Sequence, residues 1–465
     1  MDKIIYLSAG ALARAIRTKQ VSSEEVVNAH LKRIRAVNPK LNAVVQEIAD
    51  AAREQARAVD AALARGELMG PLHGVPMTIK DTLDTAGVIS TAGTQGRAAF
   101  VPREDATAVA RMRSAGAILL GKTNVPEFAL APETDNLVYG RTNNPYDLSR
   151  SPGGSSGGEA SIIAAGGSPL GLGSDCGGSI RAPAHFCGIA GMKPTAGRVP
   201  RTGHFPPVAG LTNRLWHVGP LSRFVEDLIL ALRIISGVDW RDPFLVPMSL
   251  GNPHLVALKD LRIAVYTDNG ILSPTPETSE VVKKVGGLLS NAGAHVEETR
   301  PECIEQTYDI WWGLNSADRG AGVEAVLRDA GTTEVDRYMR RFREVQLATK
   351  AMSPADFGAL LSKWDSFCAT MTRFIENFDA IICPVVAFPA QQHGFILEKD
   401  KDLGFSYCFT YNLTGWPAAV VRSGTSPEGL PIGVQVVAHP WREDVALAVA
   451  QHIETALGGW QPPPL

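Results

Sequence analysis

One segment rich in glycine and serine, residues 151–198, holds the side chains of this sequence with the clearest chemical potential. Two of its Gly-Gly-Ser runs end at Ser155 and at Ser179, 24 residues apart. Glycine adopts backbone conformations that other residues avoid and lets backbone N–H groups approach a ligand closely. A flexible linker is also rich in Gly and Ser, but apolar runs such as Ile162–Ala165 interrupt the glycines. We therefore interpret the segment as two tight turns that each hold a serine hydroxyl, as expected of a hydrolytic centre.

Lys80 ends the apolar run Val75–Ile79, which predicts a strand. At the end of a strand, a lysine amine can have either a functional or a purely structural role. A lysine after an apolar strand is more often a surface residue with its ammonium in water. Local sequence alone leaves both interpretations open.

The elements that must position these residues alternate between helix and strand, which predicts an α/β fold. Residues 7–66 are predicted to be helical, and Ser22 with Glu25 forms a capping-box pattern. Residues 126–150 are irregular and could line a pocket. Residues 311–353 are helical, aromatic and rich in Arg, which fits a lid, an acyl pocket or a plain pair of core helices. Residues 411–437 predict two paired strands.

Composition indicates one large globular domain over residues 1–465, because no linker divides the chain. The 45 Lys and Arg against 48 Asp and Glu give a net charge of −3, without a basic block, so nucleic acid is not expected as a partner. No apolar run is long enough to predict a membrane span. The six cysteines show no metal-binding spacing and predict reduced thiols in a cytoplasmic protein.

Three motifs in order resemble the amidase signature family. They are GVPMTIKD around Lys80, SPGGSSGGE around Ser155 and GSDCGGSIRAPAHFCG around Ser179. The resemblance extends to KPTAGRVPRTG and LPIGVQVV, and it implies the family's α/β fold, with a large, mixed, twisted central sheet covered by helices on both faces. Within this single domain it implies an N-terminal helical segment at 1–66, a catalytic core at 70–235 and a variable, weakly matching pocket segment at 300–400.

The resemblance also implies roles for individual residues. Ser179 corresponds to the nucleophile, Lys80 to the general base, and Ser155 to a second serine that follows a cis peptide bond and relays protons. Ala129 corresponds to a position whose backbone faces the substrate. The oxyanion hole corresponds to the backbone N–H groups of four consecutive residues, which are Cys176, Gly177, Gly178 and Ser179.

Three further residues are expected to support this centre. Ser156 follows the relay serine, and Asp175 and Arg181 flank the nucleophile. An ion pair between Asp175 and Arg181 would brace the turn, although two solvated charges fit the sequence equally well.

The implied activity is hydrolysis of a carboxylic amide through an acyl-enzyme, with esters and carbamates or urethanes as further substrates where they fit. The expected partner is a small-molecule amide, with no metal or organic cofactor, and the expected state is a monomer or homodimer.

Two local patterns suggest other chemistry. Gly153–Gly157 satisfies GxSxG, the nucleophile elbow of α/β-hydrolases, which would make Ser155 an esterase nucleophile and a histidine such as His439 essential. An elbow follows a strand directly, whereas residues 146–152 are polar and turn-like. Gly116–Thr123 satisfies the Walker A pattern, but its variable residues form an apolar strand and leave no phosphate-binding loop.

The same motifs occur in amidotransferase subunits that amidate mischarged tRNA within a complex. After KPT this chain continues AGRVPRTGHFPPVAGLTNRLWHVGP, in which Pro200, residues 204–207 and Trp216 depart from the run that such subunits carry. We therefore favour a stand-alone amidase similar to members of the fatty acid amide hydrolase type.

Overall fold

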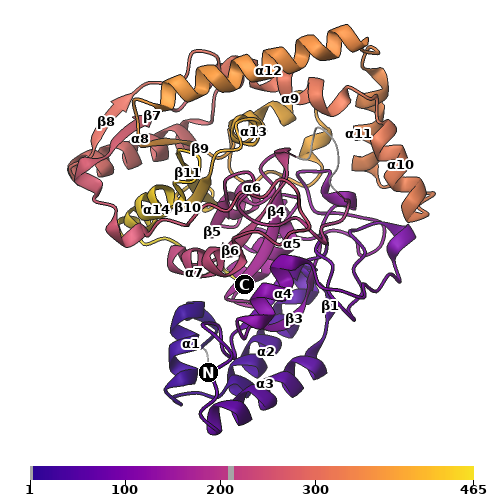
Figure 1. The fold of residues 1–465 in the computed structure, drawn as a ribbon, viewed down its shortest axis with the longest axis vertical. Coiled ribbons are helices and arrows are strands. Elements are labelled where there is room, and N and C mark those ends of the chain that lie inside the picture. Colours follow the sequence, from indigo (N-terminus) through magenta and orange to yellow (C-terminus); the bar gives the residue numbers. More distant parts are fainter. Residues whose placement is uncertain (1–3, 208–213) are drawn as a thin grey trace.

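A mixed sheet of eleven strands forms the centre of this computed structural model, which describes residues 4–207 and 214–465 (Figure 1). Its order is β1-β3-β2-β4-β6-β5-β10-β11-β9-β7-β8. The strands are β1 Val44–Glu47, β2 Pro76–Lys80, β3 Ile118–Thr123, β4 Leu170–Asp175, β5 Ala190–Lys193, β6 His217–Ser222, β7 Arg262–Val265, β8 His295–Glu298, β9 Ala380–Pro384, β10 Ala418–Thr425 and β11 Pro431–Ala438. Strands β2, β3 and β4 run parallel to one another, as do β7, β8 and β9, and the remaining pairings are antiparallel.

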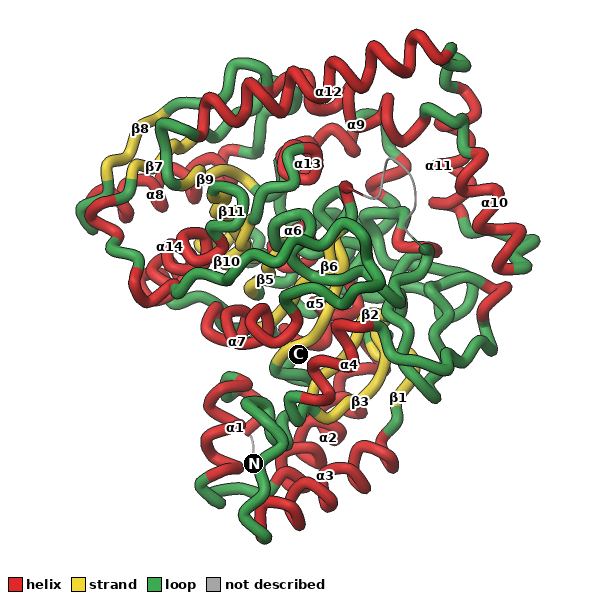
Figure 2. Tube along the Cα trace, viewed as in Figure 1, coloured by secondary structure: helices red, strands yellow, loops and turns green. Residues whose placement is uncertain are grey.

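Fourteen α-helices accompany the sheet in the described part of the chain (Figure 2). They are α1 Ala9–Arg17, α2 Ser23–Leu41, α3 Ala49–Ala64, α4 Thr107–Ser114, α5 Gly157–Ala164, α6 Arg181–Phe186, α7 Val225–Ile235, α8 Pro276–Asn291, α9 Thr307–Ser316, α10 Ala321–Ala330, α11 Arg337–Ala348, α12 Pro354–Ile375, α13 Ser406–Leu413 and α14 Glu443–Leu457. In Figure 1, α9 to α12 lie at one end of the molecule and α1 to α3 at the other.

Both faces of the sheet are buried because successive residues of a strand point to opposite faces and both sets are apolar. In β10, Ala419 and Val421 pack on one core, while Ala418 and Val420 pack on the other. The first core also receives side chains of α1, α4, α7, α8 and α14, and the second those of α5, α6, α9, α12 and α13. The predicted mixed sheet with helices on both faces is therefore confirmed.

Several local predictions agree with the structure, and one element was not anticipated. The capping box of Ser22 and Glu25 forms at the start of α2, and β10 pairs with β11. The expectation that residues 7–66 are entirely helical is wrong, because the short strand β1 runs between α2 and α3 and pairs with β3. Its sequence, VVQE, has an exposed and polar end, so it carries little strand signal.

Two further findings concern the cysteines and the lengths of the helices. All six cysteines have free thiols. Within residues 4–207 and 214–465, no helix is both long and apolar enough to cross a bilayer. Residues 208–213, which belong to the run AGRVPRTGHFPPVAGLTNRLWHVGP, and residues 1–3 of the predicted N-terminal segment lie outside the described residues.

Candidate active site

Lys80 is the last residue of β2, and its side chain is completely buried in the centre of the molecule. Its Nζ lies 2.7 Å from Ser155 Oγ, 3.0 Å from Ser174 Oγ and 3.3 Å from the Ser174 carbonyl oxygen. Burial lowers the pKa of Lys80 to about 7, although the charges of Asp175 and Glu159 act in the opposite direction. A lysine with this pKa is substantially neutral near pH 7, as a general base must be.

The turn that carries Ser155 leads directly into α5. The Gly154–Ser155 peptide bond is cis, as the resemblance implied. A Cβ on Gly154 would lie 2.6 Å from the Ala131 carbonyl oxygen, so only glycine allows this close approach of the two backbones. The turn therefore brings the Ser155 hydroxyl onto Lys80 while it packs against the loop that follows Ala129.

In the first turn of α5, the Glu159 carboxylate is buried beside Lys80. It accepts hydrogen bonds from Thr78 in β2 and from Thr123 in β3, the latter at 2.7 Å. Burial raises the pKa of Glu159 to about 7, although these hydroxyl donors and Lys80 lower it. Strand β2 thus carries both the candidate base, Lys80, and Thr78, which donates a hydrogen bond to Glu159.

The turn that carries Ser179 follows β4 and is held by Asp175, the last residue of that strand. The Asp175 carboxylate accepts the backbone N–H groups of Gly178 at 2.9 Å and Ile180 at 3.1 Å. Gly178 has a φ of +111°, which favours glycine, and a Cβ there would lie 2.8 Å from the sulfur of Cys408. The sequence therefore needs glycine at this position to bend the chain around the carboxylate.

Asp175 and Arg181 form the ion pair that the sequence left open. Arg181 Nη2 lies 2.9 Å and its Nε 3.0 Å from Asp175, and both side chains are fully buried. Asn412 in α13 donates to the same carboxylate at 2.9 Å. Burial raises the pKa of Asp175, but Arg181 outweighs it and holds that pKa well below its ordinary value. The alternative of two solvated charges is wrong.

The two serine turns touch through their backbones, since the Ser156 N–H donates to the Ser179 carbonyl oxygen at 3.1 Å. Ser179 is half-buried and lines a cavity. Within the described residues, the Ser179 hydroxyl forms no hydrogen bond, so the Ser155–Ser179 contact expected of a relay is not present in this state. Rotation about one side-chain bond can redirect a hydroxyl, and catalytic hydrogen bonds often tighten only when substrate binds.

Three of the four expected oxyanion-hole donors have no acceptor among residues 4–207 and 214–465. They are the backbone N–H groups of Cys176, Gly177 and Ser179. The fourth, that of Gly178, is directed at Asp175. Cys176, Gly177 and Ser179 also line the cavity, so their amides are the ones available to a bound carbonyl oxygen.

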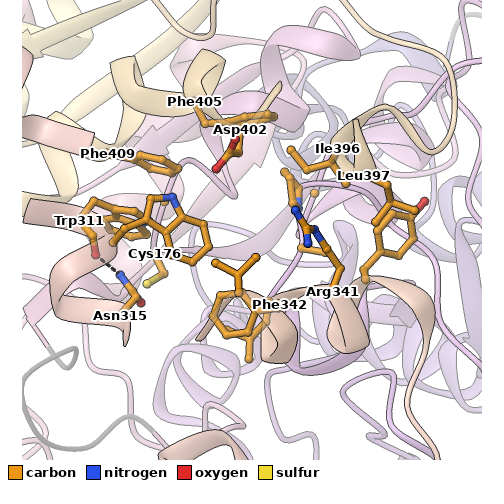
Figure 3. Close-up of a pocket in the computed structure, with 18 of the residues that line it drawn as sticks. Cys176, Trp311, Asn315, Arg341, Phe342, Ile396, Leu397, Asp402, Phe405 and Phe409 are labelled. Carbon is orange, nitrogen blue, oxygen red and sulfur yellow. Dashed lines mark hydrogen bonds between the residues drawn. The ribbon is translucent and has the colours of Figure 1, made fainter. Parts of the chain in front are cut away.

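The cavity beside Ser179 has a volume of about 470 Å³ (Figure 3). Ala129 lines it, as the resemblance implied, and so do Leu130, Ala131 and Pro132. Trp311 of α9 stacks on Phe409 of α13, with ring centroids 4.4 Å apart. The aromatic residues in the wall of the cavity are Tyr308, Trp311, Trp312, Tyr338, Phe342, Phe405 and Phe409. Residues of the 300–400 segment thus contribute much of the apolar wall, while Arg341 and Asp402 are among its charged members.

Sequence reasoning missed two residues that contact the buried lysine directly or through one neighbour. Ser174 precedes Asp175 in β4, and His204 Nε2 lies 2.9 Å from Ser174 Oγ. The residue Ser174 stood within the quoted GSDCGGS motif, but its side-chain direction depends on strand register. His204 lies in a loop that only the tertiary structure brings to β4.

The two competing local patterns lack the structure that their chemistry needs. No strand occurs between Asn144 and α5, so Ser155 does not stand on a strand-to-helix elbow, and His439 Nε2 instead contacts the Phe378 carbonyl at 2.8 Å. The variable residues of the Walker-like pattern lie largely within β3. Its Lys122 is buried, with Nζ 2.9 Å from Ser90 Oγ and 3.7 Å from Asp81.

Comparison with known proteins agrees with this geometry. A family model described as Amidase matches residues 25–447. A glutamyl-tRNA(Gln) amidotransferase subunit of Moorella thermoacetica is 36% identical, over 97% of this chain and 97% of its own length. Fatty-acid amide hydrolase 2-A of Danio rerio is 35% identical, over 99% of this chain and 91% of its own length. The structure of 6-aminohexanoate cyclic dimer hydrolase complexed with substrate superposes with a TM-score of 0.86 at 29% identity, covering 97% of each chain.

Proposed function

Because the chain belongs to the amidase signature family, we propose that it is a stand-alone amidohydrolase that cleaves carboxylic amides through an acyl-enzyme on Ser179. The observation that carries this proposal is the buried amine of Lys80, 2.7 Å from the Ser155 hydroxyl. Lys80 has a lowered pKa, and the carboxylate of Asp175 is engaged by Arg181 instead. A neutral amine in contact with a serine hydroxyl is suited to general-base catalysis.

The proposed reaction begins with attack of Ser179 Oγ on the amide carbonyl carbon. The Ser179 proton passes to Ser155, whose own proton passes to Lys80, and the carbonyl oxygen becomes an oxyanion. The amides of Cys176, Gly177 and Ser179 stabilise that oxyanion, and a single such donor contributes roughly 3 kcal/mol to the barrier reduction.

Collapse of the tetrahedral intermediate breaks the C–N bond. Lys80 returns its proton through Ser155 to the departing nitrogen, so the product leaves as a neutral amine. Water then attacks the Ser179 ester, and Lys80 takes the water proton through Ser155. As the bond between the acyl carbon and Ser179 Oγ breaks, Lys80 returns that proton through Ser155 to Ser179 Oγ, which releases the carboxylic acid and restores the starting enzyme. Because proton delivery serves a poor leaving group, we propose that esters and carbamates or urethanes that fit the cavity are also cleaved.

The aromatic wall of the cavity favours amides with an apolar or aryl acyl group. Trp311 and Phe409 offer a flat stacked surface, and a second cavity meets the first at Cys176 and Phe342. Apolar walls of this kind gain affinity by removing hydrophobic surface from water. We propose that the two halves of the substrate occupy these adjoining spaces. The six free thiols fit a reducing, cytoplasmic location, and we propose a monomer or homodimer.

Function within an amidotransferase complex is the second candidate, supported by the 36% identity to the Moorella thermoacetica protein. The protein purified alone separates the two. A free amidase hydrolyses anilides, fatty amides, peptide amides or carbamates without any partner protein. Activity that appears only with glutamine and the other members of such a complex would favour the amidotransferase instead.

A fluorophosphonate probe tests the proposed nucleophile. Mass spectrometry of the labelled protein should place the adduct on Ser179, and Ser179→Ala should abolish labelling, whereas Lys80→Ala should slow labelling and amide turnover by several orders of magnitude. Labelling of Ser155 in place of Ser179 would overturn the proposed roles and favour the alternative in which Ser155 is the nucleophile of an esterase.

A further inference from the structure

His204 is joined to the candidate base through one intervening side chain. Its Nε2 lies 2.9 Å from Ser174 Oγ, and Ser174 Oγ lies 3.0 Å from Lys80 Nζ. The other ring nitrogen, Nδ1, lies 3.2 Å from the Pro206 carbonyl oxygen. His204 is only 6% exposed, so water does not compete freely for these contacts.

The backbone around His204 is fixed by the same segment that carries Lys80. Residue 204 forms an isolated bridge with Leu83, three residues beyond the base, and the Phe205 N–H donates to the Thr82 carbonyl at 2.7 Å. On one side the imidazole packs against the Trp216 ring, with centroids 5.0 Å apart. The position of the imidazole ring is therefore fixed relative to the end of β2.

These contacts determine which nitrogen of His204 carries the proton. A carbonyl oxygen only accepts, so Nδ1 must be the N–H that donates to Pro206. Burial lowers the pKa of His204 to about 3, and the nearby Lys80 acts in the same direction, so the ring is neutral at ordinary pH. Nε2 is then an acceptor, and the Ser174 hydroxyl must donate its hydrogen to it.

We propose that His204 is a positioning residue, which holds the Ser174 hydroxyl hydrogen away from Lys80 so that the lysine lone pair is left for Ser155. This inference rests on the proposed function of Lys80 as the general base. A neutral lysine amine has two N–H groups and one lone pair. Ser174 provides two acceptors for those N–H groups, its Oγ at 3.0 Å and its carbonyl oxygen at 3.3 Å.

The third direction around the amine is toward Ser155 Oγ, at 2.7 Å. With both N–H groups engaged, the lone pair faces the hydroxyl from which it must take a proton. Without His204, the Ser174 hydroxyl is free to rotate and to donate to Lys80, which would occupy that same lone pair. The expected consequence is a slower proton transfer with little change in substrate affinity.

A pair of substitutions at position 204 tests the inference. Glutamine reaches as far as a histidine Nε2 and offers an acceptor oxygen, whereas leucine has similar bulk and offers none. His204→Leu should lower kcat for an amide on the order of 10- to 100-fold, the size of effect expected from misplacing a reacting group, with KM nearly unchanged. His204→Gln should recover most of that loss, and His254→Leu, at an exposed histidine, should match the parent.

A double-mutant comparison with Ser174→Ala separates positioning from general damage. If His204 acts through Ser174, His204→Leu should have little further effect on kcat once Ser174 is alanine, because both changes interrupt the same contact. Equal kcat values for the parent, His204→Leu and His204→Gln would overturn the inference, as would independent, additive losses from His204→Leu and Ser174→Ala. Thermal unfolding of each variant identifies losses that come from misfolding.

Parallel measurement of Lys80→Ala distinguishes failure of this inference from failure of the proposed function. Retained amide turnover in Lys80→Ala would show that Lys80 is not the general base, and the proposed role of His204 would then fail as well. Loss of turnover in Lys80→Ala together with an unaffected His204→Leu would overturn only the role of His204.

Discussion

Burial of a single lysine turns an ordinary cation into a group that can accept a proton. Lys80 Nζ meets only hydroxyl and carbonyl groups in its hydrogen bonds, while Asp175 directs its carboxylate at Arg181. An ion pair with Lys80 would have kept its amine charged. Because Asp175 pairs with Arg181 instead, the Lys80 amine is left able to lose its charge and accept a proton.

The pH dependence of amide hydrolysis follows from this pKa. Because Lys80 must be neutral and its pKa is lowered to about 7, kcat/KM should be level above pH 8 and fall about ten-fold per unit below pH 6. Glu159→Gln should move that fall to lower pH, since the Glu159 charge raises the pKa of Lys80. Initial rates with a neutral amide from pH 5 to 9 give the profile, and a flat profile to pH 5 contradicts a lysine base.

The buried pair of Asp175 and Arg181 should dominate the stability of the nucleophile turn. Asp175→Asn leaves Arg181 charged and buried, so the free energy of unfolding should drop by about 3–5 kcal/mol. The folded-state pKa of Asp175 is depressed, so its contribution is present above the unfolded pKa and is lost only as pH falls below it. Urea unfolding should therefore show the same deficit at pH 6 and pH 8.

Glu24→Gln is the matched control for that measurement. It removes an exposed ion pair with Arg57 and should leave the urea midpoint nearly unchanged. An Asp175→Asn protein as stable as this control would show that the buried pair is dispensable.

Motif spacing predicted the residues near the centre of the site but not all of their partners. Lys80 and Ser155 are in contact as expected, and Asp175 and Arg181 are paired. Ser174, His204 and Asn412 could not be predicted, because each contacts a residue that is far away in the sequence. Only the order of the strands and the packing of the loops bring these residues together.

Helix α5 approaches its neighbours so closely that its first two residues, Gly157 and Gly158, have no room for a Cβ. A Cβ on Gly158 would lie 2.5 Å from the Asn124 backbone nitrogen. Gly158→Ala should therefore lower the urea midpoint and fluorophosphonate labelling together, because the helix must shift and take the Ser155 turn with it. Gly358→Ala is the control in α12, where nothing lies within 4 Å, and it should stabilise the protein by roughly 0.5–1 kcal/mol.

Helix α9 shapes the cavity by presenting Trp311 to Phe409. Trp311→Ala removes the indole, so KM for aryl or long apolar amides should rise on the order of 10-fold or more, since burial of a large apolar side chain is worth roughly 1.5–3 kcal/mol. Acetamide, which has no large apolar group to bury against the indole, should show a much smaller change. Equal effects on both substrates would indicate damage to the catalytic centre and not to the acyl pocket.

Sequence pattern predicted elements with strong periodicity and missed those with little. Strands β10 and β11 form the pair predicted within residues 411–437. Strand β1 was missed, since four residues between two helices carry no reliable alternation. Helix α5 begins with two glycines, which local propensity disfavours, and burial of the whole helix overrides that preference.

At the scale of the whole molecule, the sheet order does not follow the order of the chain. Strands β10 and β11, which start at residue 418, lie between β5 and β9 in the middle of the sheet. They also reach the site, because Arg181 contacts Gln435 of β11 at 3.1 Å. The catalytic turn therefore depends on residues that follow it in the chain by more than two hundred positions.

During synthesis on the ribosome, this order leaves the nascent chain as two unjoined half-sheets until its last strands emerge. Before that moment β5 and β9 are open edges, and open edges invite pairing with other chains. A chain released after residue 417 should be insoluble and should be captured by chaperones, whereas co-expression of the missing piece, residues 418–465, should recover some soluble protein. Soluble, monomeric product from the shortened chain alone would contradict this dependence on the final strands.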